Sequence, residues 1–172
     1  LARATGDALA RLTIALRGFS HPSDDHVLLW DIRQFAALGP LLPSLPDQLQ
    51  AEVRAFSAHF QSSIAPALTR LPTQVVHADF NPHNLLADPD APDAITGILD
   101  FGDMVRTPRI CDLAVAASYL VDPEAPLSLL LPLVTAYHAR LPLLPQELGL
   151  LPDLITARML TTLTDRKSTR LN

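Results

Sequence analysis

The fold is decided by two stretches of the sequence, HADFNPHN at residues 77–84 and ILDFGD at residues 98–103. Transfer of a phosphoryl group requires a carboxylate that orients the acceptor hydroxyl and takes its proton, and oxygen ligands that hold Mg²⁺ on the nucleotide phosphates. Asp79 suits the first task, whereas Asn84 and Asp100 offer a neutral and a charged oxygen for the second. The two stretches therefore predict half of a phosphoryl-transfer site.

The residues between the two stretches have the pattern of a β-hairpin. Leu85–Ala87 and Ile95–Leu99 are apolar runs with the character of strands, and Asp88–Asp93 has the composition of a turn. A hairpin of this kind returns Asp100 to the side of Asn84. We therefore expect both candidate metal ligands to face one cleft.

In these motifs the chain resembles the superfamily of aminoglycoside phosphotransferases and choline kinases, whose fold is that of the protein kinases. Its members carry a catalytic loop, H-x-D-x-x-x-x-N, followed by a metal motif similar to D-F-G, and both occur here in that order. The hydroxylysine kinase-like branch, which includes bacterial forms fused to class III aminotransferases, is similar at further positions. These are Leu12–Phe19, Trp30–Asp31, Gly102–Val105, Pro108 and Asp112–Ala114. The resemblance covers residues 1–164.

The resemblance implies a fold and a role for each residue of the motifs. The fold is α+β and mainly α, the C-terminal lobe of a protein-kinase-like phosphotransferase with a small β-hairpin that carries the catalytic and metal motifs. Asp79 becomes the catalytic base, and Asn84 and Asp100 become Mg²⁺ ligands. His77 braces the catalytic loop, and Asp112 holds the same loop through hydrogen bonds to its backbone. ATP or GTP is the implied phosphoryl donor.

Other positions are interpreted more broadly. Asp103 is a candidate for contact with the substrate or a second metal, or else a solvated carboxylate. The family's usual glycine at position 78 is Ala here, and its methyl group is expected to crowd the loop. The resemblance also places several residues near the acceptor pocket, although most of them are expected to serve packing. They are Trp30, Asp31, Tyr119, Tyr137 and His138.

Simpler interpretations exist for the motif residues. Asp and Asn beside proline are ordinary turn formers, and His77 after two valines is typical of a hydrogen-bonded, half-buried histidine. The ordered pair of motifs favours the catalytic interpretation. His21, Asp24, Asp25 and His26 form a turn-rich segment that we interpret as solvated rather than as a metal cluster.

Composition limits the classes of protein. The chain has 172 residues with 48% hydrophobic content, enough to bury one core as a single domain. Its net charge of -5 offers no basic surface for nucleic acid, and its apolar runs are too short for a membrane span. Without a signal-peptide pattern and with Cys111 as the only cysteine, the expected location is the cytoplasm. Cys111 is expected to be a core residue.

Two features suggest that the natural protein differs from this chain. Its six glycines are scattered and its only lysine is Lys167, so the Gly-rich loop and the lysine of a kinase N-lobe are missing. We therefore expect a C-terminal lobe whose N-lobe lies upstream, and weak nucleotide binding by this chain alone. Residues 165–172 match the translation of a common short-read sequencing adapter and are interpreted as non-native, the alternative being a basic helix end.

The remaining sequence predicts a mostly helical body. Apolar residues at steps of three and four predict helices separated by prolines. Their expected ranges are Asp7–Phe19, Leu29–Leu38, Asp47–Leu71 with Asp47 as N-cap, Ile110–Val121, Pro126–Leu141 and Pro145–Thr164. Gly39 to Pro46 is expected to be a linker.

The predicted function is that of a small-molecule kinase fragment. The acceptor suggested by the resemblance is an amino alcohol or a hydroxy amino acid similar to hydroxylysine, and less so an aminoglycoside. An aromatic share of 5% is low for a cage that binds quaternary ammonium, such as that of choline. The alternative is a non-catalytic kinase-fold module for binding or regulation in a multidomain protein.

Overall fold

The protein is described by a computed structural model that covers residues 1–169, apart from the side chains of residues 44, 92 and 165–169. The predicted non-native tail therefore lies partly outside the described residues. The elements follow in chain order. They are α1 (Ala2–Ala15), η1 (Ile32–Ser44), α2 (Asp47–His59), η2 (Phe60–Ile64), α3 (Ala65–Leu68), β1 (Thr73–Val76), η3 (Pro82–Asn84), β2 (Leu85–Asp88), β3 (Ala91–Ile98), η4 (Phe101–Asp103), β4 (Val105–Pro108), α4 (Ile110–Ser118), α5 (Leu127–Arg140) and α6 (Pro145–Thr169).

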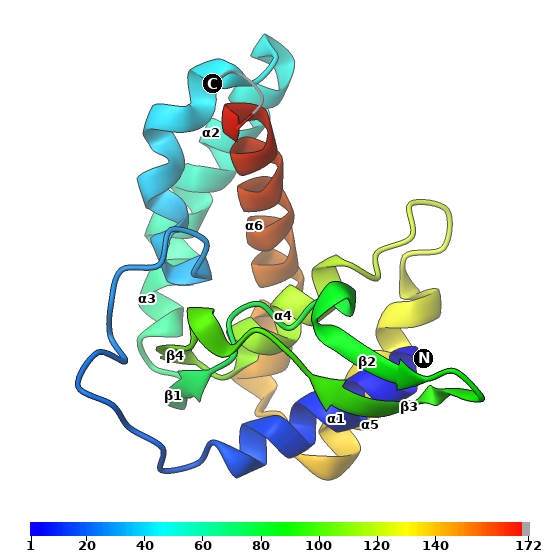
Figure 1. Ribbon diagram of the computed structural model, residues 1–172. Coiled ribbons are helices and arrows are strands. Elements are labelled where there is room, and N and C mark those ends of the chain that lie inside the picture. The colour runs from blue at the N-terminus through cyan, green and yellow to red at the C-terminus, as the bar shows by residue number, and fades with distance from the viewer. Residues whose placement is uncertain (170–172) are drawn as a thin grey trace.

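Two small antiparallel sheets position the motifs. In one, β2 pairs with β3, from Leu85 opposite Ile98 to Asp88 opposite Ala91. This is the hairpin expected from the sequence, and in Figure 1 it extends beside α1. In the other, β1 pairs with β4 from Thr73 opposite Pro108. This second sheet has no local signal in the sequence, and it brings together the segment before the catalytic loop and the segment after the metal motif.

Helices surround these sheets and supply most of the core. Every residue of α4 from Ile110 to Ala117 is buried, and the helix lies at the centre of the molecule in Figure 1. α1 packs along α5, where Gly6 lies so close that a Cβ there would collide with the Leu133 carbonyl oxygen. α6 packs against both α4 and η1. The mainly α fold class expected from the sequence is confirmed.

Helix boundaries differ from the expectation in the first part of the chain. α1 begins at Ala2 instead of Asp7 and ends at Ala15 instead of Phe19, because Gly18 has a left-handed φ of 77° that stops the helix. The region expected as a helix over 29–38 and a linker is instead one 3₁₀ stretch, η1. Its buried Phe35, Leu38 and Leu42 recur at steps of three and four, so the supposed linker also packs onto the core.

The long helix expected over 47–71 is interrupted. Asp47 is its first residue, and the N-cap is Pro46. The chain widens to a π-turn at η2, and α3 ends at Leu68. The cause is Pro66, which has no N–H to donate to the Ser62 carbonyl and whose ring would clash with that group in a regular α-helix. The later helices α4, α5 and α6 agree with their expected positions, with differences at their ends.

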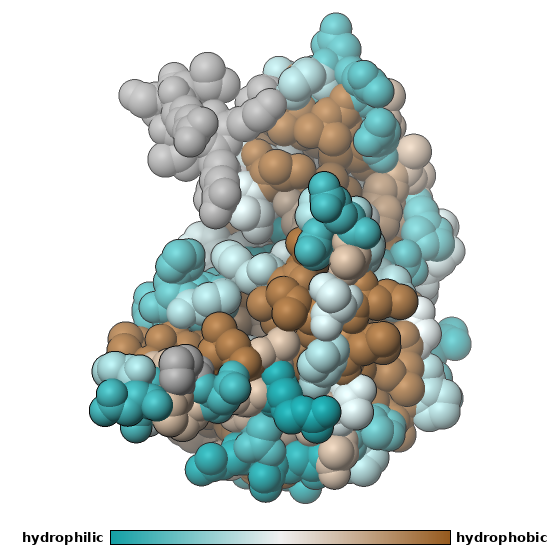
Figure 2. Space-filling view, turned by 90° about the vertical axis from the view of Figure 1, so that its right-hand side faces the viewer, coloured by the Kyte–Doolittle hydropathy of each residue, from teal (hydrophilic) through white to brown (hydrophobic). Residues whose placement is uncertain are grey.

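The surface contains apolar areas besides polar ones. Figure 2 shows one face on which apolar residues gather between polar groups. Exposed large apolar side chains include Leu127, Leu129 and Leu131 on α5. No helix within residues 1–169 combines the length and hydropathy that a bilayer span demands.

Candidate active site

The backbone of the catalytic loop is held by Asp112 in the first turn of α4. One carboxylate oxygen accepts a hydrogen bond from the His77 N–H at 3.2 Å, and the other accepts one from the Ala78 N–H at 3.0 Å. Asp112 is only 2% exposed, and its burial raises its pKa to about 6. The loop therefore depends on a buried carboxylate that approaches it from beneath.

His77 joins the two motifs. Its Nδ1 accepts a hydrogen bond from the Asp79 N–H at 3.3 Å, so this nitrogen carries no proton. Nε2 is then the protonated nitrogen and donates to the Leu99 carbonyl oxygen at 2.8 Å. The fully buried ring also packs against Phe80 and Phe101. With both nitrogens hydrogen-bonded, His77 holds the loop and has no free nitrogen to shuttle protons.

Ala78 has a left-handed backbone conformation, with φ of 66°. A side chain other than hydrogen is strained there, because Cβ approaches the carbonyl oxygen too closely. This conformation accounts for the glycine that related sequences were expected to have at the position. The methyl group is buried in a small apolar cluster with Leu28, Val76 and Val105, which partly offsets the strain.

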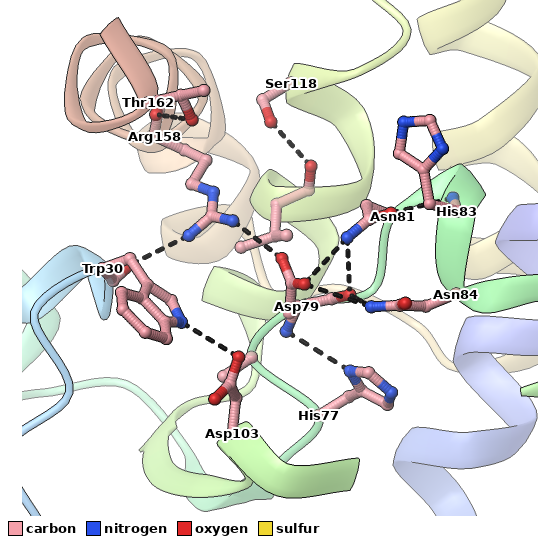
Figure 3. A network of polar contacts seen from close by, with 12 residues as sticks. Trp30, His77, Asp79, Asn81, His83, Asn84, Asp103, Ser118, Arg158 and Thr162 are labelled. Atoms are coloured by element: carbon pink, nitrogen blue, oxygen red, sulfur yellow. Dashed lines mark hydrogen bonds and ion pairs between the residues drawn. The ribbon is translucent and has the colours of Figure 1, made fainter. Parts of the chain in front are cut away.

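Asp79 lies at the centre of a polar network (Figure 3). Its Oδ2 accepts hydrogen bonds from the side-chain amides of Asn81 at 2.8 Å and Asn84 at 3.1 Å. Its Oδ1 accepts one from Arg158 Nη2 at 2.8 Å. The carboxylate side chain remains 22% exposed, so it can still reach a small molecule. Donors on three sides fix its orientation.

The two candidate metal ligands lie at the open end of the hairpin. The Leu99 N–H donates to the Asn84 carbonyl oxygen at 2.9 Å. Asp100, which follows Leu99 in the sequence, therefore lies at the same end of the hairpin as Asn84. Since the Asn84 amide nitrogen already donates to Asp79, its side-chain oxygen is the atom left for a metal. The side chain of Asp100 is exposed. An amide and a carboxylate oxygen suit Mg²⁺.

Within the described residues no group of three His, Cys, Asp or Glu side chains is arranged for a metal. The segment 21–26 is held by hydrogen bonds within itself and to the distant Arg106. Asp24 accepts from the Arg106 guanidinium and from the His21 N–H, and these hydrogen bonds lower its pKa. Two side-chain oxygens from the motifs fit a metal whose remaining ligands are phosphate oxygens and water.

A cavity of about 260 Å³ opens beside Asp79. It brings together four residues that the sequence analysis singled out, Trp30, Asp79, Asp103 and Tyr119, and three that it did not. The added residues come from α6. They are Arg158, Thr161 and Thr162.

One wall of the cavity is formed by Trp30 and Asp103. The Trp30 indole N–H donates to the Asp103 carboxylate at 3.2 Å, as Figure 3 shows. Partial burial raises the pKa of Asp103, and the negative charge of Asp79 raises it further. Two carboxylates therefore face the same small space.

Three other candidates for the acceptor pocket do not line this cavity. Asp31 is buried as the N-cap of η1, where it accepts hydrogen bonds from Arg33 and from the Thr107 hydroxyl. Tyr137 is fully buried with its hydroxyl donating to Thr13. The exposed His138 accepts from the backbone N–H that follows α5. Their side chains serve the fold, because their polar groups are already paired within it.

Arg158 is the charged residue among the three cavity residues that the sequence motifs did not indicate. It is 5% exposed and donates to the Trp30 carbonyl oxygen as well as to Asp79. Its Nε has no acceptor among the described residues, and an unpaired buried donor costs about 1–3 kcal/mol. The only sign of Arg158 in the sequence is a single arginine between Ala157 and apolar Met159 and Leu160, in a segment expected to form a packing helix.

Comparison with known proteins identifies the family. A family model described as "Phosphotransferase enzyme family" matches residues 1–150. The chain belongs to this family. Among curated proteins, the chain is 29% identical over 166 residues to the hydroxylysine kinase of Danio rerio, covering 92% of the chain and 47% of that protein. It is 25% identical over 170 residues to the hydroxylysine kinase of Bos taurus, covering 92% and 45%. The phosphotransferase chain thus spans about half the length of these relatives.

Solved structures of phosphotransferases share the fold. The amicoumacin kinase hAmiN, in complex with AMP-PNP, Ca²⁺ and Ami, superposes with a TM-score of 0.70 at 16% identity, covering 98% of this chain and 51% of that one. The aminoglycoside phosphotransferase APH(3'')-Id of Streptomyces rimosus, in complex with ADP and streptomycin, gives a TM-score of 0.60 at 18% identity, covering 92% and 61%. The expected superfamily is confirmed. The fused aminotransferase suggested by the resemblance is not shown by these matches.

Proposed function

We propose that this chain is the C-terminal lobe of a small-molecule kinase that transfers the γ-phosphoryl group of ATP or GTP to a hydroxyl. The observation that carries the proposal is Asp79, oriented by two asparagine amides at the wall of a cavity and adjoining the candidate metal ligands. The proposed acceptor is a hydroxy amino acid or amino alcohol similar to hydroxylysine, or else an aminoglycoside. Identity to hydroxylysine kinases favours the first class.

Asp79 is the proposed base. An acceptor in the cavity donates its hydroxyl hydrogen to Asp79 Oδ1 or Oδ2, and the carboxylate holds the oxygen toward the phosphoryl group before it takes the proton. Asn81 and Asn84 donate to Oδ2 and so keep the carboxylate in one orientation. His77 and Asp112 keep the loop backbone in place. They are positioning residues in this proposal.

Asn84 and Asp100 are the proposed ligands of Mg²⁺. A bound Mg²⁺ neutralises the charge on the transferred phosphoryl group. Within the chain, Asn84 would perform two tasks, since its amide nitrogen orients Asp79 and its side-chain oxygen would be left to hold Mg²⁺. The remaining grip on the nucleotide belongs, in this proposal, to a lobe outside these 172 residues, and a fused aminotransferase would be a further domain of the same polypeptide.

Substitution of Asp79 tests the role of the base. In the complete polypeptide that contains this chain, Asp79→Asn should lower kcat by at least about 10², as expected for loss of a positioned base. The assay measures phosphorylation of hydroxylysine and of a panel of amino alcohols and aminoglycosides. Asp47→Asn is the matched control, because it removes the same charge from an exposed turn of α2. Unchanged turnover of Asp79→Asn disproves the assignment.

A second proposal is a kinase-fold module that binds a ligand without catalysis. Two observations favour it, namely the ion pair between Arg158 and Asp79, which makes the carboxylate less available as a base, and the strained Ala78. The complete gene separates the two proposals. A Gly-rich loop and a strand lysine in the preceding residues favour the kinase, and their natural absence favours the binding module.

A further inference from the structure

The cavity beside Asp79 contains charges of both signs. Asp79 and Asp103 provide two carboxylates, and Arg158 provides one guanidinium. The rest of the lining is aromatic or bears hydroxyl groups, from Trp30, Tyr119 and two threonines. The hydroxyls of both threonines donate to carbonyl oxygens of α6 itself, so they do not pair with these charges. A small molecule that enters this space therefore meets one fixed cation and two fixed anions.

Arg158 keeps unused hydrogen-bonding capacity. A guanidinium has five N–H donors, and here Nη1 donates to the Trp30 carbonyl oxygen and Nη2 to Asp79. Nε has no acceptor among the described residues. The side chain is only 6% exposed, so bulk water has little access to the remaining donors. The open space beside the guanidinium is the cavity. A buried cation with spare donors is the usual partner of a carboxylate.

We infer that the cavity selects an acceptor that bears a carboxylate, and that Arg158 is the residue that binds this carboxylate. This inference rests on the proposed function and narrows its acceptor to a hydroxy amino acid. The carboxylate binds the guanidinium, the ammonium group lies at Asp103, and the hydroxyl faces Asp79. An aminoglycoside or a simple amino alcohol carries no carboxylate and leaves Arg158 without this partner.

The charges of the cavity agree with such an acceptor. Asp103 accepts a hydrogen bond from the Trp30 indole and, among the described residues, lacks a cationic partner. The two carboxylates and one guanidinium sum to one negative charge. A hydroxylated diamino acid carries two ammonium groups and one carboxylate, a sum of one positive charge. The net charges of ligand and cavity are therefore opposite, and each charged group of the ligand can face a group of opposite sign in the cavity.

Binding of the carboxylate also affects Asp79. In this structure Arg158 pairs with Asp79 Oδ1. An acceptor carboxylate competes for the same guanidinium and weakens that ion pair as it binds. Asp79 then keeps the two asparagine donors on Oδ2, while Oδ1 becomes free to accept the hydroxyl hydrogen. The correct acceptor thus releases the base that acts on it.

The test compares hydroxylysine with its carboxamide, which has the same hydroxyl and amines without the negative charge. In the complete polypeptide, kcat/KM should favour the acid by roughly 10- to 100-fold, the size expected of a charge-assisted hydrogen bond. Arg158→Gln should abolish most of this preference, and Arg158→Lys should retain part of it. Arg140→Gln is the matched control, because Arg140 also pairs with an aspartate but lies on the surface away from the cavity.

Several results overturn the inference. The inference is refuted if the wild-type protein uses hydroxylysine and its carboxamide equally well. This comparison needs no variant, so the inference is tested even if Arg158→Gln fails to fold. An equal loss with both acceptors in Arg158→Gln also refutes it, since the guanidinium then acts on the phosphoryl group or on Asp79. The inference is also refuted if Arg158→Gln keeps the full preference for hydroxylysine over its carboxamide.

Calorimetry without nucleotide separates this inference from the proposed function. If no acceptor is phosphorylated, yet the wild-type protein binds hydroxylysine more tightly than the carboxamide and Arg158→Gln removes the difference, the proposed kinase fails and the carboxylate site stands. If both acceptors are phosphorylated but bind alike, the kinase stands and the carboxylate site fails.

Discussion

Replacement of Glu147 by alanine should destabilise the fold by about 3–5 kcal/mol, the cost of breaking a buried ion pair on one side. Glu147 is fully buried at the start of α6. Its two oxygens accept hydrogen bonds from Nε and Nη2 of Arg109, each at 2.7 Å. The pair joins the N-cap residue of α4 to α6, and so joins the helix that carries Asp112 to the one that carries Arg158.

The magnitude follows from the groups that lose their partners. Arg109 is only 9% exposed, and in Glu147→Ala its guanidinium would keep only the Pro142 carbonyl oxygen as an acceptor. The Leu144 N–H also loses its acceptor, since it donates to Glu147 at 2.8 Å. A cation that cannot reach water and has lost its counterion dominates the cost. Glu147→Gln keeps the shape and one acceptor, so it should cost less, about 1.5–3 kcal/mol.

Thermal unfolding of the protein measures this effect. For a domain of this size, 3–5 kcal/mol corresponds to a fall in Tm of roughly 6–20 °C. Asp7→Ala provides the control, because the ion pair of Asp7 with Arg140 is exposed on both sides and should contribute about 0–1 kcal/mol. The reasoning is refuted if Glu147→Ala and Asp7→Ala lower Tm equally, since burial would then have no influence on the cost.

Three further predictions concern the loop and its surroundings. Burial raises the pKa of the Cys111 thiol, so iodoacetamide should label this residue only after unfolding; labelling of the native protein at the rate of a free thiol contradicts this. The fold raises the pKa of Asp112 from 3.8 to about 6, so the stability linked to this carboxyl is present below pH 4 and is lost as the pH rises through 6. The free energy of unfolding should therefore depend less on pH in Asp112→Asn, and an unchanged dependence refutes the raised pKa. Ala78 has a left-handed backbone, so Ala78→Val should destabilise the fold by about 2 kcal/mol or more. Ala78→Gly should destabilise it by less than about 1 kcal/mol, because relief of strain offsets the lost methyl contact. Equal melting temperatures of the two variants contradict this prediction.

Much of the fold could be predicted because its signals are local. The hairpin between the motifs follows from two apolar runs and a turn within 15 residues, and β2 and β3 pair as expected. The helices α4, α5 and α6 follow from apolar periodicity bounded by proline. The first helices were placed less well, because Gly6 serves close packing against α5 and η1 continues through prolines that resemble a linker.

The candidate site was only partly accessible from the sequence. Asp79, Asn84 and Asp100 could be named, because their spacing is short and their residue types match one chemistry. Asp31 is a pocket candidate from the sequence, like Trp30, yet it turns inward as a helix cap, since neighbours in an irregular segment can point to opposite sides. Arg158 was not named, because a single arginine in a helix has no motif to mark it.

The sequence by itself determined the candidate groups, because two short motifs specify a carboxylate, an amide and a second carboxylate in a set order around one hairpin. The tertiary structure alone decided which distant groups complete the site. Arg158 meets Asp79 across 79 positions, and β1 meets β4 across the whole hairpin. Such contacts depend on how helices with similar apolar faces pack together, and the packing is set by side-chain shape in three dimensions, which local periodicity does not encode.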